Sequence, residues 1–290
     1  MVFVTLCSFV NAQTFYVKAG GGYSFSLSPY SMGVNSKDIF WRERDLQTGN
    51  FVPAIIKESR EVKGSYSAGF NASATVGYNL TDIIGVEIGA SYIHGKEYKT
   101  SDLAQDITSD AGVITIDNSS LSTSKSAATV ILVSPSFRLT APGGFLQPYL
   151  AAGPVLGFAK LENEYEAHSD YDGEQKEVRH EKYSGGLSIG MRGAVGVDIR
   201  LSETLALFSE LTFNSINYFP KEKEITKYEV NDVNRLPDLT ERERRTVYVK
   251  NVATDTRDEN YNDPDEPAKA NRVSFAMNSL VANVGIKLTL

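Results

Sequence analysis

The sequence lacks any uncharged apolar run approaching the ~20 residues that a membrane-spanning helix needs. Cysteine is nearly absent, since Cys7 is the single example in 290 residues, and there are only three histidines. Basic charge is not in excess, because 29 Lys and Arg face 36 Asp and Glu, a formal net charge of −7. These absences exclude a helical membrane protein, make a zinc site or other cofactor unexpected, and give no electrostatic basis for binding nucleic acid.

The N-terminal residues MVFVTLCSFVNA are uncharged, mostly apolar and end in small residues. We expect residues 1–12 to be a secretory signal, cleaved after Ala12, although the basic segment that usually opens such a signal is missing. Lipidation at Cys7 is the weaker alternative, because Leu6 stands where a small residue should precede a lipidated cysteine. Cleavage leaves residues 13–290 as a single domain without cysteine, so disulfides play no part in the expected fold.

From Thr14 onward the dominant pattern has a period of two, which places alternate side chains on opposite faces of a strand. In one segment, Ile84, Val86, Ile88, Ala90 and Tyr92 alternate with Gly85, Glu87, Gly89 and Ser91. Eight such segments are found, near 14–27, 64–80, 83–98, 123–140, 145–161, 181–201, 205–219 and 272–290. No helical period competes with this pattern, so the chain is expected to be all-β.

The connections between these segments alternate in length. The short ones, near 79–82, 141–144 and 202–204, carry the Asn, Asp, Gly, Pro and Ser residues of hairpin turns. The long ones, near 28–63, 99–122, 162–180 and 220–271, are polar and charged. This pattern predicts an eight-stranded antiparallel up-and-down transmembrane β-barrel with four long extracellular loops and short periplasmic turns. Both termini should lie at the short-turn end, and the segments are long enough to project beyond the outer surface.

The composition of the polar face favours an apolar exterior. A soluble barrel of the lipocalin type would direct its apolar face inward and expose a strongly charged face to water. Here the polar face is mostly Gly, Ser, Thr, Asn and Ala, which suits the crowded interior of a narrow barrel. The apolar face carries aromatic residues near the strand ends, where interfacial girdles are expected: Phe15, Tyr23, Phe25, Tyr66, Tyr78, Tyr92, Phe145 and Phe158.

The signal-like start, the opening strand FYVKAGGGY at 15–23, the eight alternating segments and the terminal strand together resemble the small bacterial outer-membrane β-barrel family of the OmpA and OmpX type. The resemblance covers Thr14 to Leu290. It implies insertion in the outer membrane of a Gram-negative cell and a structural or surface-binding role. The chain ends in Leu290, whereas such barrels usually end in an aromatic residue.

Isolated charges fall on the small polar face. They are Lys18, Glu87, Arg138, Arg192, Asp198, Glu210 and Lys287. A lone charge in a low-dielectric interior costs several kcal/mol, so we expect the four cations and three anions to pair with one another in the periplasmic half of the lumen. Their expected role is to fill the barrel; the alternative is a gate or selectivity filter for small solutes.

Catalytic and metal sites find little support. Deacylases among barrels of this kind use a Ser and a His near the outer rim. The sequence offers three histidines: His94, near Ser91, and His168 and His180, in or beside the 162–180 loop. No recognisable motif surrounds any of them. The stretch 262–266 (NDPDE) offers oxygen ligands for Ca²⁺ but lacks the spacing and Gly of an EF-hand loop. We therefore expect no enzyme, no metal and no cofactor.

The long segments are the remaining source of function. The 220–271 segment is rich in charges of both signs, and residues 246–250 (TVYVK) alternate again, which predicts a hairpin above the membrane. Trp41, beside two arginines, is expected at the interface or packed within the first long segment. We expect a monomer that contacts outer-membrane lipid and lipopolysaccharide and binds an extracellular protein or glycan. The alternatives are a narrow porin-like channel, a lipid A-modifying enzyme and a soluble carrier.

Overall fold

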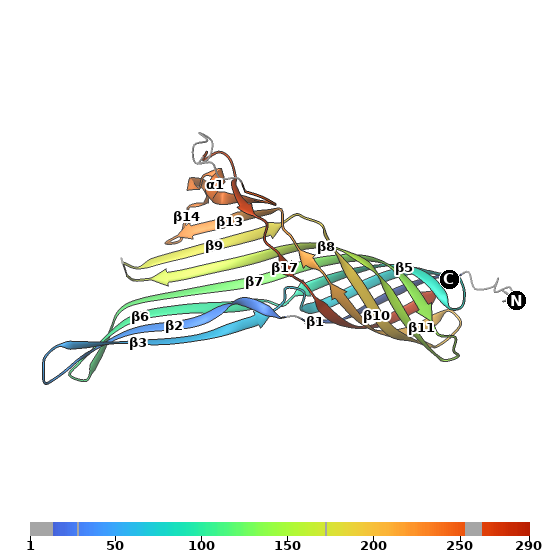
Figure 1. Ribbon diagram of the computed structural model, residues 1–290, viewed down its shortest axis with the longest axis horizontal. Coiled ribbons are helices and arrows are strands. Elements are labelled where there is room, and N and C mark those ends of the chain that lie inside the picture. Colours follow the sequence, from blue (N-terminus) through green and yellow to red (C-terminus); the bar gives the residue numbers. More distant parts are fainter. Residues whose placement is uncertain (1–13, 28, 172, 253–262) are drawn as a thin grey trace.

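The computed structural model describes residues 14–27, 29–171, 173–252 and 263–290. Within these ranges eight strands pair antiparallel in a closed ring, in the order β1, β4, β5, β7, β8, β10, β11 and β18, with β18 returning to β1. Their bounds are β1 (Thr14–Ser26), β4 (Gly69–Asn79), β5 (Ile84–Gly95), β7 (Val113–Thr140), β8 (Leu146–Ser169), β10 (Ser188–Arg200), β11 (Leu205–Ser215) and β18 (Ser279–Thr289). The predicted eight-stranded barrel is confirmed, and it forms one end of an elongated molecule (Figure 1).

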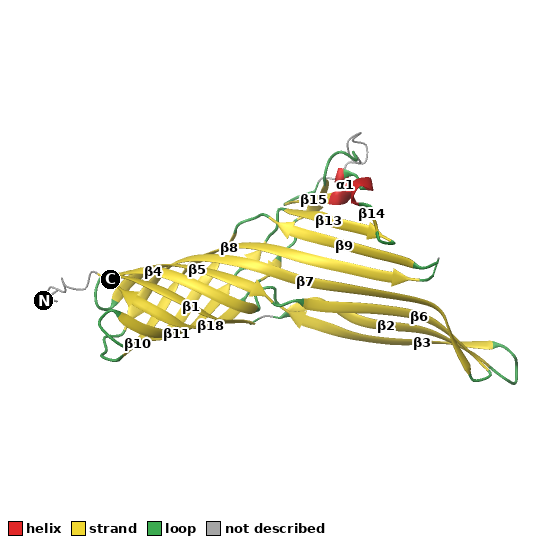
Figure 2. Cartoon of the chain, turned by 180° about the vertical axis from the view of Figure 1, so that it is seen from behind, coloured by secondary structure: helices red, strands yellow, loops and turns green. Residues whose placement is uncertain are grey.

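Short turns close the barrel at the end where the described chain begins and finishes (Figure 2). In the turn from β4 to β5, the hydroxyl of Thr81 accepts a hydrogen bond from the backbone N–H of Ile84 at 2.9 Å. Ser202 does the same for Leu205 in the turn from β10 to β11, at 3.1 Å. Such local bonds are the reason that Thr and Ser suit tight turns. The backbone N–H of Leu290 donates to the carbonyl oxygen of Phe15 at 2.8 Å, so the first strand and the C-terminus lie side by side.

The apolar face of the barrel points outward, as predicted. Ile88, Phe137 and Val284 each expose more than half of their surface, whereas the polar residues that alternate with them are buried. Phe15 and Tyr78 meet near the turn end with ring centroids 4.6 Å apart, and Tyr23 contacts Phe25 and Phe70 near the opposite end. Aromatic residues at both ends of the apolar band fit interfacial girdles.

Tyr66 was expected in a girdle and instead lies inside the barrel mouth. It precedes β4, which begins only at Gly69, and its ring packs edge-on against Phe275 with centroids 5.6 Å apart. Ala68, two residues further along the chain, is also buried. The alternating pattern in the sequence begins before the strand does. Residues 66–68 share this pattern but lie outside the barrel wall, which the chain enters at Gly69.

Strands β7 and β8 continue far beyond the barrel and change neighbours at its mouth. Across residues 129–139 β7 pairs with β5, and across 113–126 it pairs with β6 (Tyr98–Asp110). Similarly, β8 pairs with β10 across residues 146–157 and with β9 (Gln175–Ser184) across residues 161–169. The continuation joins an open sheet in the order β16, β15, β13, β9, β8, β7, β6, β2 and β3, which projects away from the turn end (Figures 1 and 2).

The remaining elements complete this sheet and the barrel mouth. They are β2 (Tyr30–Arg44), β3 (Phe51–Gly64), β12 (Asn217–Tyr218), β13 (Glu222–Val230), β14 (Val233–Asn234), the 3₁₀ helix η1 (Leu236–Asp238), α1 (Glu241–Arg244), β15 (Arg245–Val249), β16 (Ala268–Asn271) and β17 (Phe275–Ala276). Among the described residues no helix is long and apolar enough to cross a membrane.

The four segments expected to be long loops consist largely of β-structure, which corrects that expectation. The 28–63 segment contains most of the β2–β3 hairpin, and the 220–271 segment contributes β13 to β16. Residues 245–249, expected in a hairpin, form β15, which pairs antiparallel with β13 and parallel with β16. The projecting sheet has water on both faces, so its strands need no apolar side and leave no clear period of two in hydrophobicity. Strands β7 and β8, with 28 and 24 residues, continue beyond the barrel into the projecting sheet.

One expected strand, 181–201, is two strands in the structure. It breaks at Gly185 and Gly186, which have φ values of 75° and 85° that glycine adopts readily. A Cβ on Gly186 would lie 2.1 Å from the carbonyl oxygen of Phe219. The break therefore lets β9 leave the barrel wall and lets the chain around Phe219 pack closely at the mouth.

Candidate functional site

Seven charged side chains form an unbroken series inside the barrel, and they are the seven predicted from the sequence. Arg192 contacts Glu210 (2.7 Å), Glu210 contacts Lys18 (3.3 Å), Lys18 contacts Glu87 (3.0 Å), Glu87 contacts Arg138 (3.0 Å), Arg138 contacts Asp198 (2.6 Å) and Asp198 contacts Lys287 (2.6 Å). The sign of the charge alternates at every step. Four of these contacts join strands that are separated by one strand in the ring, so the series links strands that the backbone ladder does not pair.

Burial makes these contacts necessary. Arg138 and Asp198 have no exposed surface, and Lys18, Glu87 and Glu210 are also buried. Charges of this kind are tolerated in an interior only when they are paired and hydrogen-bonded. The small Gly, Ser and Thr side chains around them leave the space that the long charged side chains occupy.

Two tyrosines that were not among the predicted interior residues complete the network. The hydroxyl of Tyr16 donates to Glu87 at 2.7 Å, and the hydroxyl of Tyr149 donates to Glu210 at 2.9 Å. The guanidinium of Arg138 lies 3.6 Å from the centre of the Tyr149 ring, whose face attracts the cation. The signal was available, because Tyr16 and Tyr149 alternate in step with the polar residues of their strands and not with the apolar ones.

Each tyrosine is paired with a glycine on the neighbouring strand. Tyr16 lies opposite Gly77 and Tyr149 lies opposite Gly196. A Cβ on Gly77 or Gly196 would lie 2.1 Å or 2.4 Å from the tyrosine ring. These glycines therefore allow the rings to lie flat on the inner wall, beside the charges.

We expect Arg192→Ala and Glu210→Ala each to lower the stability of the folded barrel by about 2 kcal/mol, because each removes a charge-assisted hydrogen bond of a buried group. The measurement is the temperature at which the heat-modifiable gel mobility of the folded barrel is lost. Arg200→Ala, at the exposed end of β10, serves as the control. Unchanged mobility transitions in both network variants would count against the pairing.

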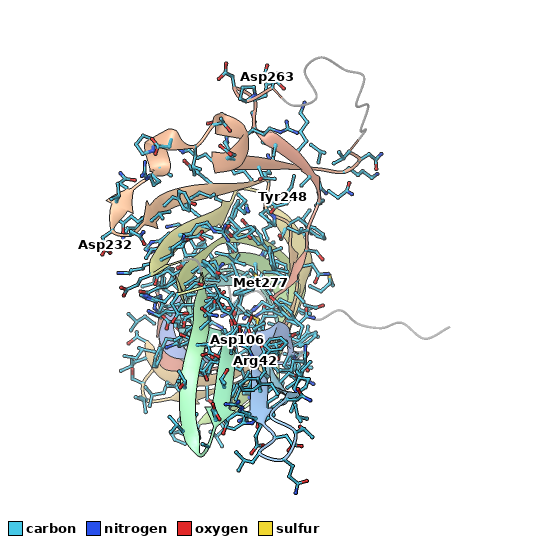
Figure 3. All side chains as sticks on the ribbon, turned by 90° about the vertical axis from the view of Figure 1, so that its left-hand side faces the viewer. Arg42, Asp106, Asp232, Tyr248, Asp263 and Met277 are labelled. Carbon is cyan, nitrogen blue, oxygen red and sulfur yellow. The ribbon has the colours of Figure 1, made fainter. Side chains whose placement is uncertain are left out.

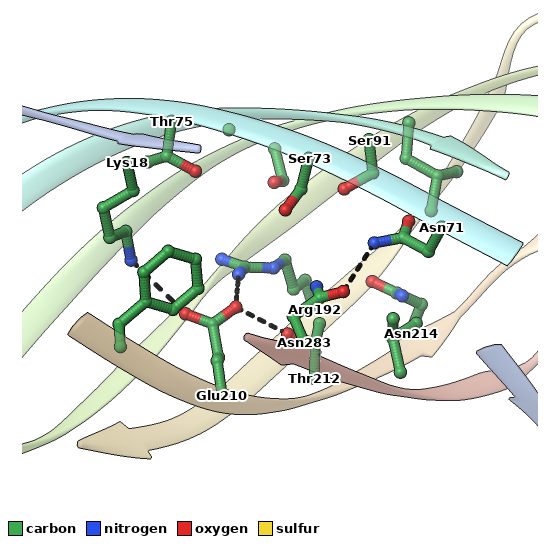
Figure 4. Close-up of a pocket in the computed structure, with 15 residues that line it drawn as sticks. Lys18, Asn71, Ser73, Thr75, Ser91, Arg192, Glu210, Thr212, Asn214 and Asn283 are labelled. Carbon is green, nitrogen blue, oxygen red and sulfur yellow. Dashed lines mark hydrogen bonds and ion pairs between the residues drawn. The ribbon is translucent and has the colours of Figure 1, made fainter. Parts of the chain in front are cut away.

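A small polar cavity of about 20 Å³ lies beside the network (Figure 4). Asn71 and Asn283 lie at one end of it, where the Asn71 amide donates to the Asn283 side-chain oxygen at 2.7 Å, and Lys18, Arg192 and Glu210 lie at the other. Its volume corresponds to roughly one water molecule.

An apolar cluster that the period-two pattern does not predict occupies the opposite mouth of the barrel. Its buried members are Ile93, Ala128, Val130, Leu132, Val155, Leu161, Ile216, Tyr218 and Met277. Met277 lies near the centre when the molecule is viewed from the tip of the sheet (Figure 3). Burial raises the pKa of Tyr218 to about 12, so its hydroxyl stays protonated and donates to the Gly185 carbonyl oxygen at 2.8 Å. The signal was the run AATVILV at 127–133, which is apolar on both faces.

The histidines considered for catalysis do not assemble a site with a nucleophile. His94 points outward from β5, whereas Ser91 lines the interior cavity, so the two lie on opposite faces of one strand. His168 contacts Glu166 at 3.2 Å on the exposed part of β8. Within the described ranges no group of three or more His, Cys, Asp or Glu side chains is placed to hold a metal. Asn262 of the proposed Ca²⁺ stretch lies outside those ranges, as does the expected signal.

The projecting sheet carries ion pairs at its surface. Glu222 accepts two hydrogen bonds from Arg245, and these hold the pKa of the Glu222 carboxyl below its usual value. Trp41 lies in β2, opposite Ala54 of β3 and Ile107 of β6, and is partly buried there. This places Trp41 within the sheet, so its expected packing within the first long segment is what the structure has.

Two solved structures of outer membrane proteins align with this chain over most of its length. This chain aligns with the outer membrane protein OprG from Pseudomonas aeruginosa, with 12% identity and a TM-score of 0.43. The alignment covers 96% of this chain and 96% of OprG. The outer membrane protease OmpT from Escherichia coli aligns over 97% of this chain and 98% of its own, with 9% identity and a TM-score of 0.27. No curated protein matches the sequence.

The family comparison covers most of the chain. The model of the outer membrane protein beta-barrel domain matches residues 2–234. Together with the closed barrel and its outward apolar face, this places the protein in the bacterial outer membrane. The chain belongs to the outer membrane protein beta-barrel domain family.

Proposed function

We propose that this protein displays a binding surface on the cell exterior and that its barrel is a closed membrane anchor. The observation that carries the proposal is the division of the molecule into a filled barrel and a long projecting sheet. Charged side chains meet across the periplasmic half of the lumen, and the apolar cluster occupies the mouth. The two longest strands, β7 and β8, extend into the sheet and not into a longer barrel.

The same division argues against the channel alternative. A solute passing through the lumen would have to separate Arg138 from Glu87 and Asp198, which are buried partners, and also displace Met277 and Tyr218. Separating a buried pair leaves uncompensated charge in a low-dielectric interior, which costs several kcal/mol. The expected state of the barrel is therefore closed, and lipid and lipopolysaccharide are its partners along the outer wall.

We expect the purified protein to produce no stable conductance steps in planar bilayers, because neither closure opens without breaking buried contacts. The matched measurement uses Arg138→Ala with Met277→Ala, which removes one fully buried side chain from each closure and should produce brief openings. Conductance steps of constant size from the unmodified protein would overturn the closed-anchor proposal in favour of a channel.

Surface display is tested separately by trypsin digestion of intact cells. Lys57 and Arg60 on β3 should be cleaved, because both lie on the exposed sheet. Lys18 and Lys287 should resist, because they are buried in the barrel. Protection of the β3 sites in intact cells, with cleavage after lysis, would place the sheet on the wrong side of the membrane.

A further inference from the structure

The projecting sheet ends in a long strand that has one unpaired edge. Strand β3 pairs with β2 over its whole length, and no other strand of the described chain pairs with it. Nearly all of its side chains are exposed, including the large apolar Ile55 at 59% and Ile56 at 47%. An edge strand of this length presents a row of backbone N–H and C=O groups that another extended strand can join.

The sequence of β3 is complementary to itself when it is reversed about Ser59. Residues 57–61 are Lys, Glu, Ser, Arg and Glu. In an antiparallel pair of two copies centred on Ser59, Lys57 lies opposite Glu61 and Glu58 lies opposite Arg60, and each pair occurs twice. Ile56 then lies opposite Val62. Opposite charges and apolar residues directly across from each other are the combinations that stabilise antiparallel strands.

This register is distinguished from its neighbours. Only alternate residues of β3 direct their backbone groups to the free edge, so neighbouring antiparallel registers differ by two residues. Such a shift in one direction places Glu58 opposite Glu58, and a shift in the other places Arg60 opposite Arg60 and Lys57 opposite Lys63. Like charges directly opposite are destabilising. The centred register pairs residues 54–64 of each copy, so Pro53, which has no N–H to donate, lies just outside it.

We propose that the partner of this surface is a second copy of the same chain, joined edge to edge through antiparallel β3 strands with a two-fold axis at Ser59. The inference rests on the proposed function, because it requires the sheet to stand outside the cell, and it names the partner of that surface. It also goes beyond the monomer expected from the sequence.

The direction of β3 decides where the second copy lies. The strand runs along the long axis of the molecule, from the tip of the sheet to the barrel mouth (Figures 1 and 2). Antiparallel pairing reverses that direction in the partner, so the two barrels lie at opposite ends of the joined sheet. The two copies therefore sit in two facing membranes, and the contact holds one cell surface to another.

The test uses two variants of equal net charge in the full-length protein, reconstituted into phosphatidylcholine vesicles. Lys57→Glu with Glu58→Lys makes all four cross-strand pairs like-charged. Lys57→Glu with Glu61→Lys exchanges two charges and keeps every pair opposite. Both variants lose the Lys57–Asp38 contact equally. Vesicles carrying the unmodified protein or the second variant should cluster, as measured by light scattering, and those carrying the first should stay dispersed.

A disulfide test reports the register directly. Ser59→Cys, in a background with Cys7→Ser, places two thiols across the two-fold axis, where Cα atoms about 4.5–5.5 Å apart lie within the range that a disulfide spans. Mild oxidation of clustered vesicles should give a covalent dimer. Leu46→Cys, which is 81% exposed at the tip between β2 and β3, should give none.

Several results would overturn the pairing: dispersed vesicles with the unmodified protein, equal behaviour of the two charge variants, or equal cross-linking at positions 59 and 46. Heat-modifiable mobility of each variant verifies that the barrel is folded. If trypsin reaches β3 on intact cells and the vesicles nevertheless stay dispersed, this inference fails while surface display stands. If β3 is protected on intact cells, the proposed function itself fails.

Discussion

Replacing Arg138 with alanine should destabilise the folded barrel by about 3–5 kcal/mol, the largest loss expected from any single change in the network. The guanidinium contacts both Glu87 and Asp198 and lies against the Tyr149 ring, and the residue has no exposed surface. Its removal leaves two carboxylates with fewer compensating cations in an interior that cannot hydrate them. The measurement is the free energy of unfolding by urea in lipid vesicles.

A triple variant separates this electrostatic effect from lost packing. Arg138→Ala combined with Glu87→Gln and Asp198→Asn removes the cation together with the two charges that it compensates. We expect part of the stability to return, because breaking a buried pair costs more than removing both of its charges. A loss of less than about 1 kcal/mol in the single variant would show that the network does not hold the barrel together.

The second large effect concerns the outer wall. Ile88→Lys should cost about 2–4 kcal/mol, because the side chain lies near the middle of β5 on the face that we assign to lipid. Ile88 is 63% exposed in the isolated chain. A position with the same exposure that faced water would tolerate lysine, so the expected cost comes from contact with lipid.

The control is Val113→Lys at the start of β7, near the tip of the sheet, where the valine is 66% exposed. We expect it to change the free energy of unfolding by less than about 0.5 kcal/mol, as most surface substitutions do. Equal costs at the two positions would mean that the wall around Ile88 does not face lipid.

The barrel could be predicted because lipid imposes a contrast between its two faces. Every strand in the ring must direct apolar side chains outward and small or paired polar side chains inward, so its sequence alternates. The same alternation predicts that Lys18, Arg138 and Asp198 lie on the inner face of their strands. Their pairing followed from the cost of burying unpaired charge.

The projecting sheet could not be predicted in the same way. Both of its faces meet water, and a strand such as β3, with Lys57 to Glu61 in succession, resembles a solvated loop in hydrophobicity. The apolar cluster at the barrel mouth could not be predicted for a different reason. Ile216 and Met277 come from segments that leave the barrel wall and turn inward, and this change of direction has no periodic signal.

Strand β5 allows the central claim to be measured most directly. Single cysteines at each position from Ile84 to His94, in a background with Cys7→Ser, can be spin-labelled in reconstituted vesicles. The collision rate of each label with molecular oxygen, which concentrates in the bilayer, then reports which face of the strand meets lipid. We expect maxima at 84, 86, 88, 90 and 92 and minima at 85, 87, 89 and 91. Maxima at the odd positions, or no alternation along the strand, would contradict a barrel whose apolar wall faces lipid and whose charges meet in its interior.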